Sequence, residues 1–295
     1  MDSAQLQTFV AAAESGSFSA AANIVHASTS SVTERIAALE HRIGARLFER
    51  SRKGCVLTEA GARFLPRAQV MLSSWANARD EARLPARFTG QLRIGGQYAI
   101  WPEFLIPWID RLRIESPQLA FNLTAGASAR LNREVAAGTV DFAVLYLPVI
   151  GAAVEAREVV NDRLVLVCST SVGDWRKAWV EIDWGETMRG PIGEATGYLD
   201  SGGVTLDLGG MALRWLVEQK AAGYLPERLA RRAIKEGALR RIDDMPAFDF
   251  PAYAIWRRDN RFDMDAIARN LSAFVGETDN LNAPTTGMDA EDAAG

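Results

Sequence analysis

The chain of 295 residues is poor in the side chains that enzymes and metal sites use most. It has two histidines, His26 and His41, and two cysteines, Cys55 and Cys168. Because both histidines lie near the N-terminus, the sequence after His41 has no histidine to serve as a general base or metal ligand. The cysteines are too few and too widely spaced for a disulfide framework or a C-x-x-C metal site. These absences predict a protein that is not an enzyme, binds no metal and needs no cofactor.

Long apolar runs and common catalytic motifs are also missing. No window approaches the roughly 18 consecutive apolar residues of a membrane helix. The sequence contains no G-x-S-x-G elbow, no H-E-x-x-H pair and no phosphate-binding P-loop. Its first residues have neither the basic start nor the long apolar segment of a signal peptide. We therefore expect a cytoplasmic protein without a membrane partner.

Charge is distributed unevenly along the chain. The net charge of −4, taken alone, argues against a nucleic-acid partner. Residues 1–58 nevertheless carry +1 and residues 59–89 carry +2, which leaves −7 for residues 90–295. Within residues 28–58, six Lys or Arg face three Asp or Glu. A short basic stretch beside an acidic body fits a DNA-binding head joined to a second domain.

The N-terminal segment begins with two predicted short helices. Apolar residues recur every three or four positions in residues 4–13, and Gly16 is suited to end that helix. Ser17 can cap a second, alanine-rich helix over residues 18–25, because its hydroxyl can accept a free backbone N–H.

A third helix is predicted after a tight turn at residues 26–27. Ser28 can cap it, Gly44 can end it, and Val32 and Ile36 face the core at helical spacing. Two short helices, a turn and a third helix form the helix-turn-helix pattern. In that pattern the last helix enters the major groove of DNA, where base edges can be distinguished.

The start of this third helix carries the candidate base contacts. A carboxylate there can accept a hydrogen bond from a cytosine amino group, and hydroxyls can serve bases or phosphates. Basic side chains, among them Arg42, can contact phosphates, which position a protein without reading sequence. The main residues predicted to contact DNA are Ser28, Thr29, Ser30, Thr33, Glu34, Arg35, Arg50, Arg52 and Lys53. Two alternatives stay open, because Glu34 can instead pair with Arg35 or a neighbouring basic side chain, and each basic residue can be an ordinary surface charge.

A hairpin and a long helix are predicted next. Residues 46–57 indicate a β-hairpin with a basic tip, and Thr58 can cap a helix that runs to about residue 86. An apolar stripe along a helix between domains is suited to pair with the same helix of a second subunit. The residues predicted for dimerisation are Leu65, Leu72 and Trp75. We therefore expect a dimer or tetramer, with packing on the chain's own domain as the alternative.

After Gly90 the pattern changes to alternating strands and helices. Strands are predicted at residues 92–95, 119–124, 140–147, 164–169 and 253–256, and helices at residues 102–112, 128–137, 210–221, 226–236 and 264–275. Gly223 to Pro226 are predicted as a turn, and the polar tail 277–295 as disordered. The alternation predicts the α/β class with parallel sheets, in which ligands bind beyond the carboxyl ends of strands.

Several motifs resemble the LysR-type transcriptional regulators. The chain carries Gly16-Ser17-Phe18, Ala21-Ala22, Leu39-Glu40, Gly44, Leu47-Phe48-Glu49-Arg50 and Leu57-Thr58-Glu59-Ala60-Gly61. This match over residues 1–65 is dense, and it continues more weakly at residues 91–95, 138–141 and 222–226. Leu65-Pro66, Trp75 and Trp184-Gly185 look most like the HdfR-type subgroup, which is linked to repression of motility genes. Residues 28–33 depart from the family's common Ser-Gln-Pro-Ala-Val-Ser, so its usual target sequence does not carry over.

The resemblance implies three functional parts. A winged helix-turn-helix would occupy residues 1–58, a dimerising linker helix residues 59–89, and an effector domain residues 90–276. The effector domain would resemble periplasmic binding proteins, with one lobe at about 90–163 and 258–276 and a second lobe at about 164–257. An unknown small-molecule effector would lie between the lobes.

The resemblance also implies which residues meet that effector. They are Gln97, Tyr98, Ala99, Ile100, Gly126, Ala127, Ser128, Thr196, Gly197 and Tyr198. Several begin helices, where free N–H groups and the helix dipole favour an anion. Related chains often have a hydroxyl residue at the position of Ala99, and ordinary loop or cap roles are the alternative for each residue.

The sequence therefore predicts a sequence-specific DNA-binding transcriptional regulator. Paired subunits would place their recognition helices on a pseudo-palindromic double-stranded operator. A solute-binding protein is the rival interpretation. It would leave the first 89 residues unexplained, and such a protein would normally be exported.

Overall fold

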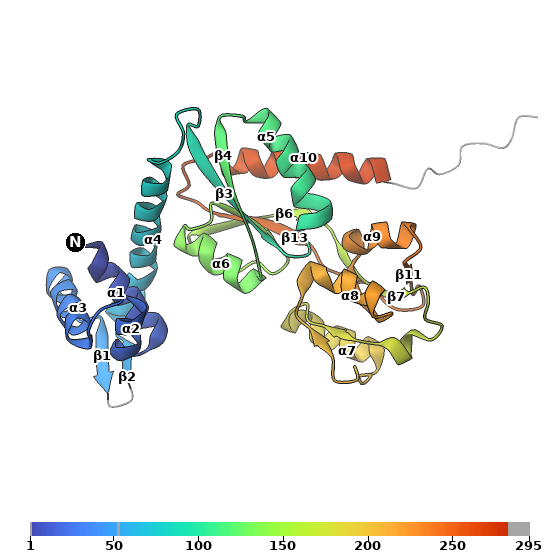
Figure 1. The fold of residues 1–295 in the computed structure, drawn as a ribbon, viewed down its shortest axis with the longest axis horizontal. Helices are drawn as coiled ribbons and strands as arrows, with labels where there is room; N and C mark the ends of the chain where they lie inside the picture. The colour runs from blue at the N-terminus through green and yellow to red at the C-terminus, as the bar shows by residue number, and fades with distance from the viewer. Residues whose placement is uncertain (1, 52–53, 283–295) are drawn as a thin grey trace, which may run out of the picture.

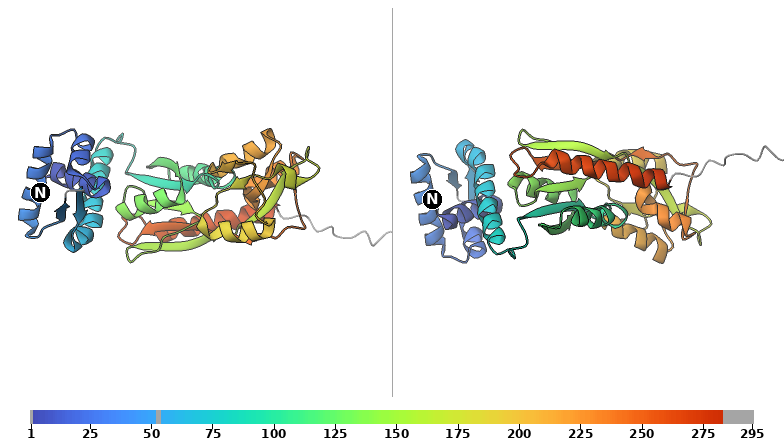
Figure 2. Two further views of the ribbon diagram at one scale, coloured as in Figure 1. Left: turned by 90° about the horizontal axis from the view of Figure 1, so that it is seen from below. Right: turned by 90° about the horizontal axis from the view of Figure 1, so that it is seen from above.

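The computed structural model describes residues 2–51 and 54–282. Figure 1 shows an N-terminal head, one long helix and two α/β lobes, in that order along the chain. The molecule is elongated, with the head at one end and the second lobe at the other (Figure 2). The predicted basic tip at Arg52 and Lys53 and residues 283–295 of the predicted tail lie outside the described residues. Within the described ranges, no helix is both long and apolar enough to cross a membrane.

The head consists of three helices and a hairpin. They are α1 (Ser3–Ser15), α2 (Phe18–Ile24), α3 (Thr29–Ile43), β1 (Phe48–Ser51) and β2 (Gly54–Leu57). The predicted stops are confirmed, because Gly16 and Gly44 end α1 and α3 in the left-handed conformation. Ser28 caps α3 as predicted, accepting from the N–H of Ser31 at 3.1 Å. Phe9 of α1 and the apolar face of α3 are fully buried in one core, which fixes α3 on the head.

Helix α4 (Glu59–Glu81) connects the head to the lobes. Thr58 caps it as predicted, but it ends at Glu81 rather than near residue 86. Leu65 and Leu72 are half-buried against the core of the chain's own head, which is the alternative that the sequence left open. Trp75 is 62% exposed. One side of α4 is therefore occupied within the subunit, while Trp75 remains accessible.

The first lobe, lobe I, is a five-stranded sheet covered by helices. Its strands are β3 (Gly90–Gln97), β4 (Leu119–Gly126), β5 (Phe142–Leu145), β6 (Val154–Val160) and β13 (Ala252–Arg257), in the order β4-β3-β5-β13-β6. Its helices are the π-helical turn η1 (Trp101–Leu105), α5 (Ile106–Glu115), α6 (Ser128–Ala137) and α10 (Met264–Asn282). Two boundaries differ from the prediction. Residues 252–257 belong to lobe I, because β13 pairs antiparallel with β5 and β6. Residues 277–282 continue α10 instead of starting the tail.

The second lobe, lobe II, is built around the buried strand β7. Its strands are β7 (Arg163–Ser169), β8 (Glu181–Ile182), β9 (Thr205–Leu206), β10 (Ala222–Pro226), β11 (Leu239–Arg241) and β12 (Phe248–Asp249). Its helices are η2 (Trp175–Ala178), α7 (Glu186–Thr196), η3 (Gly209–Met211), α8 (Ala212–Glu218) and α9 (Glu227–Lys235). The prediction of parallel sheets is wrong for the sheet around β7, because β10, β11 and β12 all pair with β7 in antiparallel fashion, whereas β8 and β9 pair in parallel. The predicted turn at residues 223–226 is wrong too, because these residues form the buried strand β10.

Gly61 joins the hairpin to α4 through a contact that excludes any side chain. A Cβ atom there would lie 2.1 Å from the Leu47 carbonyl oxygen and 2.9 Å from Leu57 Cδ2. The N–H of Thr58 donates to the same Leu47 carbonyl at 2.9 Å. The base of the hairpin therefore lies directly on the first turn of α4.

We predict that Gly61→Ala lowers the free energy of unfolding by about 1–3 kcal/mol, because the backbone must shift to relieve the overlap. Urea denaturation followed by circular dichroism measures the change. Gly276→Ala in α10 is the matched control, since an added Cβ at this helical position meets nothing within 4 Å. That control substitution should raise the free energy of unfolding by about 0.5–1 kcal/mol. Equal stability of Gly61→Ala and the wild type would contradict the close contact.

Candidate DNA interface and ligand sites

The surface predicted to contact DNA lies at the start of α3. Ser28 Oγ is 2.8 Å from Ser30 Oγ and 2.9 Å from Ser31 Oγ. Ser28, Thr29 and Ser30 are exposed. The helix therefore presents a group of hydroxyls to solvent at its N-terminal end, where positive dipole charge favours negative partners such as phosphate.

Glu34 is exposed one turn further along α3. Among the residues that the structure describes, its carboxylate makes no hydrogen bond or ion pair, so the salt bridge to Arg35 is not formed. Arg35 is half-buried and donates from Nη1 to Thr8 Oγ1 on α1 at 3.4 Å. Thr33 is half-buried as well. The Glu34 carboxylate is thus available to a donor outside the protein.

A carboxylate of α3 anchors the start of the hairpin. Glu40 Oε1 accepts from the N–H of Leu47 at 2.7 Å and from the N–H of Phe48 at 3.1 Å. Arg50 lies in β1, and Arg42 is exposed near the end of α3. Helix α3 and the hairpin are therefore parts of one packed head.

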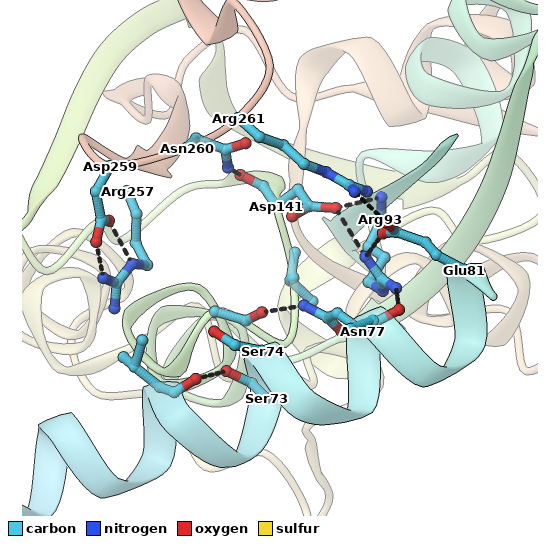
Figure 3. Close-up of a pocket in the computed structure, with 14 residues that line it drawn as sticks. Ser73, Ser74, Asn77, Glu81, Arg93, Asp141, Arg257, Asp259, Asn260 and Arg261 are labelled. Atoms are coloured by element: carbon cyan, nitrogen blue, oxygen red, sulfur yellow. Dashed lines mark hydrogen bonds and ion pairs between the residues drawn. The ribbon is translucent and has the colours of Figure 1, made fainter. Parts of the chain in front are cut away.

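Helix α4 is bound to lobe I by contacts around Arg93 (Figure 3). Arg93 lies in β3 and is only 6% exposed. Its Nη1 is 3.5 Å from Asp141 Oδ2 and 3.6 Å from Glu81 Oε1, and its backbone N–H donates to Asp141 at 2.9 Å. Burial raises the pKa of Asp141, while hydrogen bonds and the charge of Arg93 oppose that shift. With Arg261, which pairs with Glu81, these residues form the Arg93 cluster.

Further contacts continue along the same face of α4 (Figure 3). Ser73 and Asn77 donate to carbonyls at the C-terminal end of α6 at 2.5 and 3.0 Å. Arg261 also donates to the Gln91 carbonyl at 2.7 Å. A cavity of about 280 Å³ remains between α4 and lobe I. The arginines that line it are all paired with carboxylates, so it offers no free cation to a ligand.

The lobes are joined by two neighbouring chain segments. One links β6 to β7 through Asp162, and the other links β12 to β13 through Phe250, whose N–H donates to the Asp162 carbonyl at 2.8 Å. The buried Asp162 carboxylate accepts from Tyr146 of lobe I at 3.2 Å and from the N–H of Arg228 of lobe II at 3.4 Å. The Tyr146 and Phe250 rings stack 4.2 Å apart. Burial raises the pKa of Asp162, and burial with the Asp162 charge raises that of Tyr146 well above its ordinary value.

The lobes touch closely at two further points. A Cβ atom on Gly209 would lie 2.7 Å from Tyr98 Cβ, and one on Gly210 would lie 2.7 Å from the Tyr98 carbonyl oxygen. A Cβ atom on Gly185 would lie 2.5 Å from Leu147 Cδ1. A cavity that described residues of both lobes line measures about 10 Å³, which is room for about one water molecule.

The effector residues predicted in lobe I lie at the carboxyl ends of β3 and β4. Gln97 Oε1 accepts from the N–H of Ala99 at 2.7 Å, so this turn satisfies its own donor. Ala99 and Ile100 are buried and line the small cavity between the lobes. Residues 126–128 end β4 and begin α6, where no side chain caps the helix.

The effector residues predicted in lobe II lie at the end of α7 and directly after it. Thr196 Oγ1 donates to the Ile192 carbonyl at 2.9 Å, and Gly197 ends α7 in the left-handed conformation. Thr196 and Tyr198 line a separate cavity of about 330 Å³, whose lining residues all fall within residues 179–199. The structure therefore contains a lobe II cavity that the sequence prediction did not separate from the space between the lobes.

Both parts of the chain match known family descriptions. Residues 3–62 match the "Bacterial regulatory helix-turn-helix protein, lysR family", and residues 85–278 match the "LysR substrate binding domain". The chain belongs to the LysR family of transcriptional regulators. It is accordingly a DNA-binding regulator with an effector-binding domain, and not an enzyme.

Relatives of this LysR regulator match it over different lengths. The HTH-type transcriptional regulator HdfR of Yersinia enterocolitica is 37% identical over 112 residues, which is 38% of each chain. HdfR of Salmonella newport is 25% identical over 267 residues, covering 88% of this chain and 94% of the relative. Full-length LysG from Corynebacterium glutamicum, solved with bound effector Arg, has a TM-score of 0.58 and 22% identity, covering 94% of this chain and 99% of that one. The likeness to LysG shows a shared fold.

The Arg93 cluster of this LysR regulator was not predicted from the sequence. The available signal was a charged residue between Leu92 and Ile94 in an apolar strand, because a buried arginine needs a carboxylate partner. Asp141, directly before the buried strand β5, was the second signal. Helix α7, which forms one wall of the lobe II cavity, was not predicted either, because Pro191 and the glycines around it are unfavourable in a helix.

We predict that Arg93→Met lowers the free energy of unfolding by about 3–5 kcal/mol, because it leaves the buried Asp141 carboxylate without its arginine partner, whereas Glu81 keeps its ion pair with Arg261. Arg93→Met combined with Asp141→Asn should recover part of this loss, since one uncompensated carboxylate is removed. Urea denaturation of the full chain measures both. The control is Arg113→Met, whose ion pair with Asp110 is exposed and should contribute about 0–1 kcal/mol. If Arg93→Met costs no more than Arg113→Met, the cluster does not hold α4 on lobe I.

Proposed function

We propose that this LysR-family protein recognises a specific operator through the start of α3. The observation that carries the proposal is the exposed group formed by Thr29, Ser30 and Glu34 on a rigid helix. A carboxylate accepts from the amino group of cytosine and cannot accept from the guanine or thymine acceptors in the major groove. Arg42, Arg52 and other basic side chains of the head would neutralise phosphates and set the orientation.

The proposal includes pairing of two subunits along α4. A groove of about 420 Å³ runs beside α4 and is lined by Val10, Leu72 and the exposed Trp75, among others. An exposed tryptophan beside half-buried apolar residues is typical of surfaces that bind a partner. A second copy of α4 suits the groove, because a two-fold arrangement lets the same residues meet each other. Two heads would then read half-sites of a pseudo-palindromic operator.

The proposal also includes control by a small-molecule effector. An effector between the lobes requires them to part at the Tyr98 and Gly185 contacts, because the present cavity holds about one water molecule. It acts only if it binds one lobe arrangement better than the other. The 25–37% identity to HdfR proteins supports placing the chain in an HdfR-like subgroup that works on DNA in the cytoplasm.

We predict different consequences for the two classes of DNA contact. Glu34→Gln should change the preferred base at one operator position by about 5- to 150-fold, the discrimination of one good base contact. Arg52→Ala and Lys53→Ala should weaken binding to every DNA, each reducing the salt slope of log K by about 1. Fluorescence anisotropy with the DNA flanking the protein's own gene, titrated at several salt concentrations, measures both effects.

A scrambled fragment of equal length is the control for this titration. Wild-type protein should prefer the native fragment and lose affinity as salt rises. If Glu34→Gln and Arg52→Ala changed all affinities by the same factor, the assignment of Glu34 to base recognition would be wrong. Equal, weak binding of the wild type to both fragments would contradict the expectation that the DNA flanking the protein's own gene contains its operator.

We predict that Trp75→Glu shifts the protein towards the monomer, because a charge then enters the paired apolar face. Multi-angle light scattering at micromolar concentration measures the molar mass. Ile114→Glu is the matched control, since Ile114 is 81% exposed on α5, away from α4. A wild-type monomer, or a mass that Ile114→Glu lowers as much as Trp75→Glu, contradicts pairing along α4.

A further inference from the structure

The lobe II cavity has the size of a small-molecule site. Its volume of about 330 Å³ falls in the range of small-ligand pockets, roughly 300–1,000 Å³. It lies along β8 and the loop after it on one side and α7 on the other. Because its lining comes from one lobe, it exists without any parting of the lobes.

The walls of the cavity are mainly aromatic and apolar. Trp179 and Trp184 contribute to one side, and Met188 and Ile192 of α7 to the other. Tyr198 lies at the exposed edge, with 72% of its surface accessible and its backbone in the left-handed region at φ 52°. A Cβ atom on Gly193 would lie 2.5 Å from the Tyr198 ring, so the ring rests directly on α7. A strained backbone thus holds an aromatic ring at the edge of an apolar cavity, and such strain is common at ligand sites.

The charged groups of the cavity leave one carboxylate without a partner. Asp183 accepts from the N–H of Gly185 at 2.9 Å and from Arg189 at 3.2 Å. Glu181 is half-buried and lines the cavity, yet no hydrogen bond or ion pair reaches its carboxylate from the described part of the chain. Two carboxylates and one guanidinium give the lining a formal charge of −1. This environment favours a cation and repels a carboxylate, and aromatic faces add attraction for an ammonium group.

The cavity wall is continuous with the junction of the lobes. Trp184 donates from Nε1 to the Tyr224 carbonyl at 2.8 Å and lies 5.9 Å from the Phe250 ring. Phe250 in turn stacks on Tyr146 of lobe I. A ligand against Trp184 therefore contacts a series of packed rings that ends in the other lobe.

We propose that this lobe II cavity binds a small aromatic amine. The ammonium group pairs with the Glu181 carboxylate, and the ring packs between Trp184 and the apolar side chains of α7. Binding itself is independent of the proposed function. Only the role of the amine as an effector of DNA binding rests on that function.

The test is isothermal titration calorimetry of the full chain with two probes that share one ring system. Tryptamine carries an ammonium group, and indole-3-acetate carries a carboxylate. The expected result is saturable one-site binding of tryptamine and none of indole-3-acetate. Glu181→Gln should weaken tryptamine binding about tenfold or more, because it removes a charge-assisted hydrogen bond.

Two further variants separate binding from folding. Glu186→Gln removes an exposed carboxylate from α7 outside the cavity lining, and tryptamine affinity should stay unchanged. Met188→Trp fills the cavity and should abolish binding in a protein that still melts cooperatively. The proposal is overturned if tryptamine does not bind, if both probes bind equally, or if Glu181→Gln and Glu186→Gln behave alike.

The anisotropy assay with operator DNA then tests the effector role separately. Tryptamine that changes DNA affinity of the wild type, but not of Glu181→Gln, supports the amine as an effector. A protein that binds tryptamine but prefers no DNA contradicts the proposed operator recognition and leaves the amine site supported. Tryptamine binding without any change in DNA affinity overturns the effector role.

Discussion

The arrangement of this molecule depends on one buried arginine. Arg93 sits inside lobe I and reaches two carboxylates, one from its own lobe and one from the last turn of α4. Leaving so deeply buried a charge unpaired would destabilise the folded protein, so Arg93 holds α4 and lobe I together in one geometry. Gly61 and Thr58 fasten the other end of α4 to the head. Head, linker helix and lobe I thus form one connected body.

The contacts of lobe II are of a different kind. It meets lobe I through the stacked Tyr146 and Phe250 rings, the shared Asp162 carboxylate and close approaches at glycines. Aromatic stacking and glycine contacts permit a change of angle more readily than a buried ion pair does. The head therefore follows lobe I, and in the proposed function a signal that starts in lobe II reaches DNA by changing how the two lobes meet.

Local chemistry made much of the fold predictable. The caps at Ser28 and Thr58 and the stops at Gly16 and Gly44 depend on a few neighbouring residues, and all four are confirmed. The predictions were wrong where the structure of a segment depends on pairing with a segment far away in the sequence. The Gly-Tyr-Leu-Pro segment has turn-forming residues at its ends, yet pairing with β7 makes it a buried strand. The segment 252–257 is an apolar strand in either lobe, and only its pairing with β5 and β6 decides between them. The hydroxyl surface of α3 was predictable, whereas the Arg93 cluster and the lobe II cavity depend on contacts between distant segments.

The two segments that join the lobes also describe how the chain is assembled. Val160 and Ala252 are partners in the lobe I sheet, and Arg163 and Asp249 are partners in lobe II. The chain thus leaves lobe I and returns to it at the same place, as an inserted domain does. Residues 163–249 form a module whose two ends are adjacent, so a tight turn in its place would still let β6 and β13 pair. Such a module can be exchanged between regulators, acquiring a new ligand while the head, linker and first sheet stay unchanged.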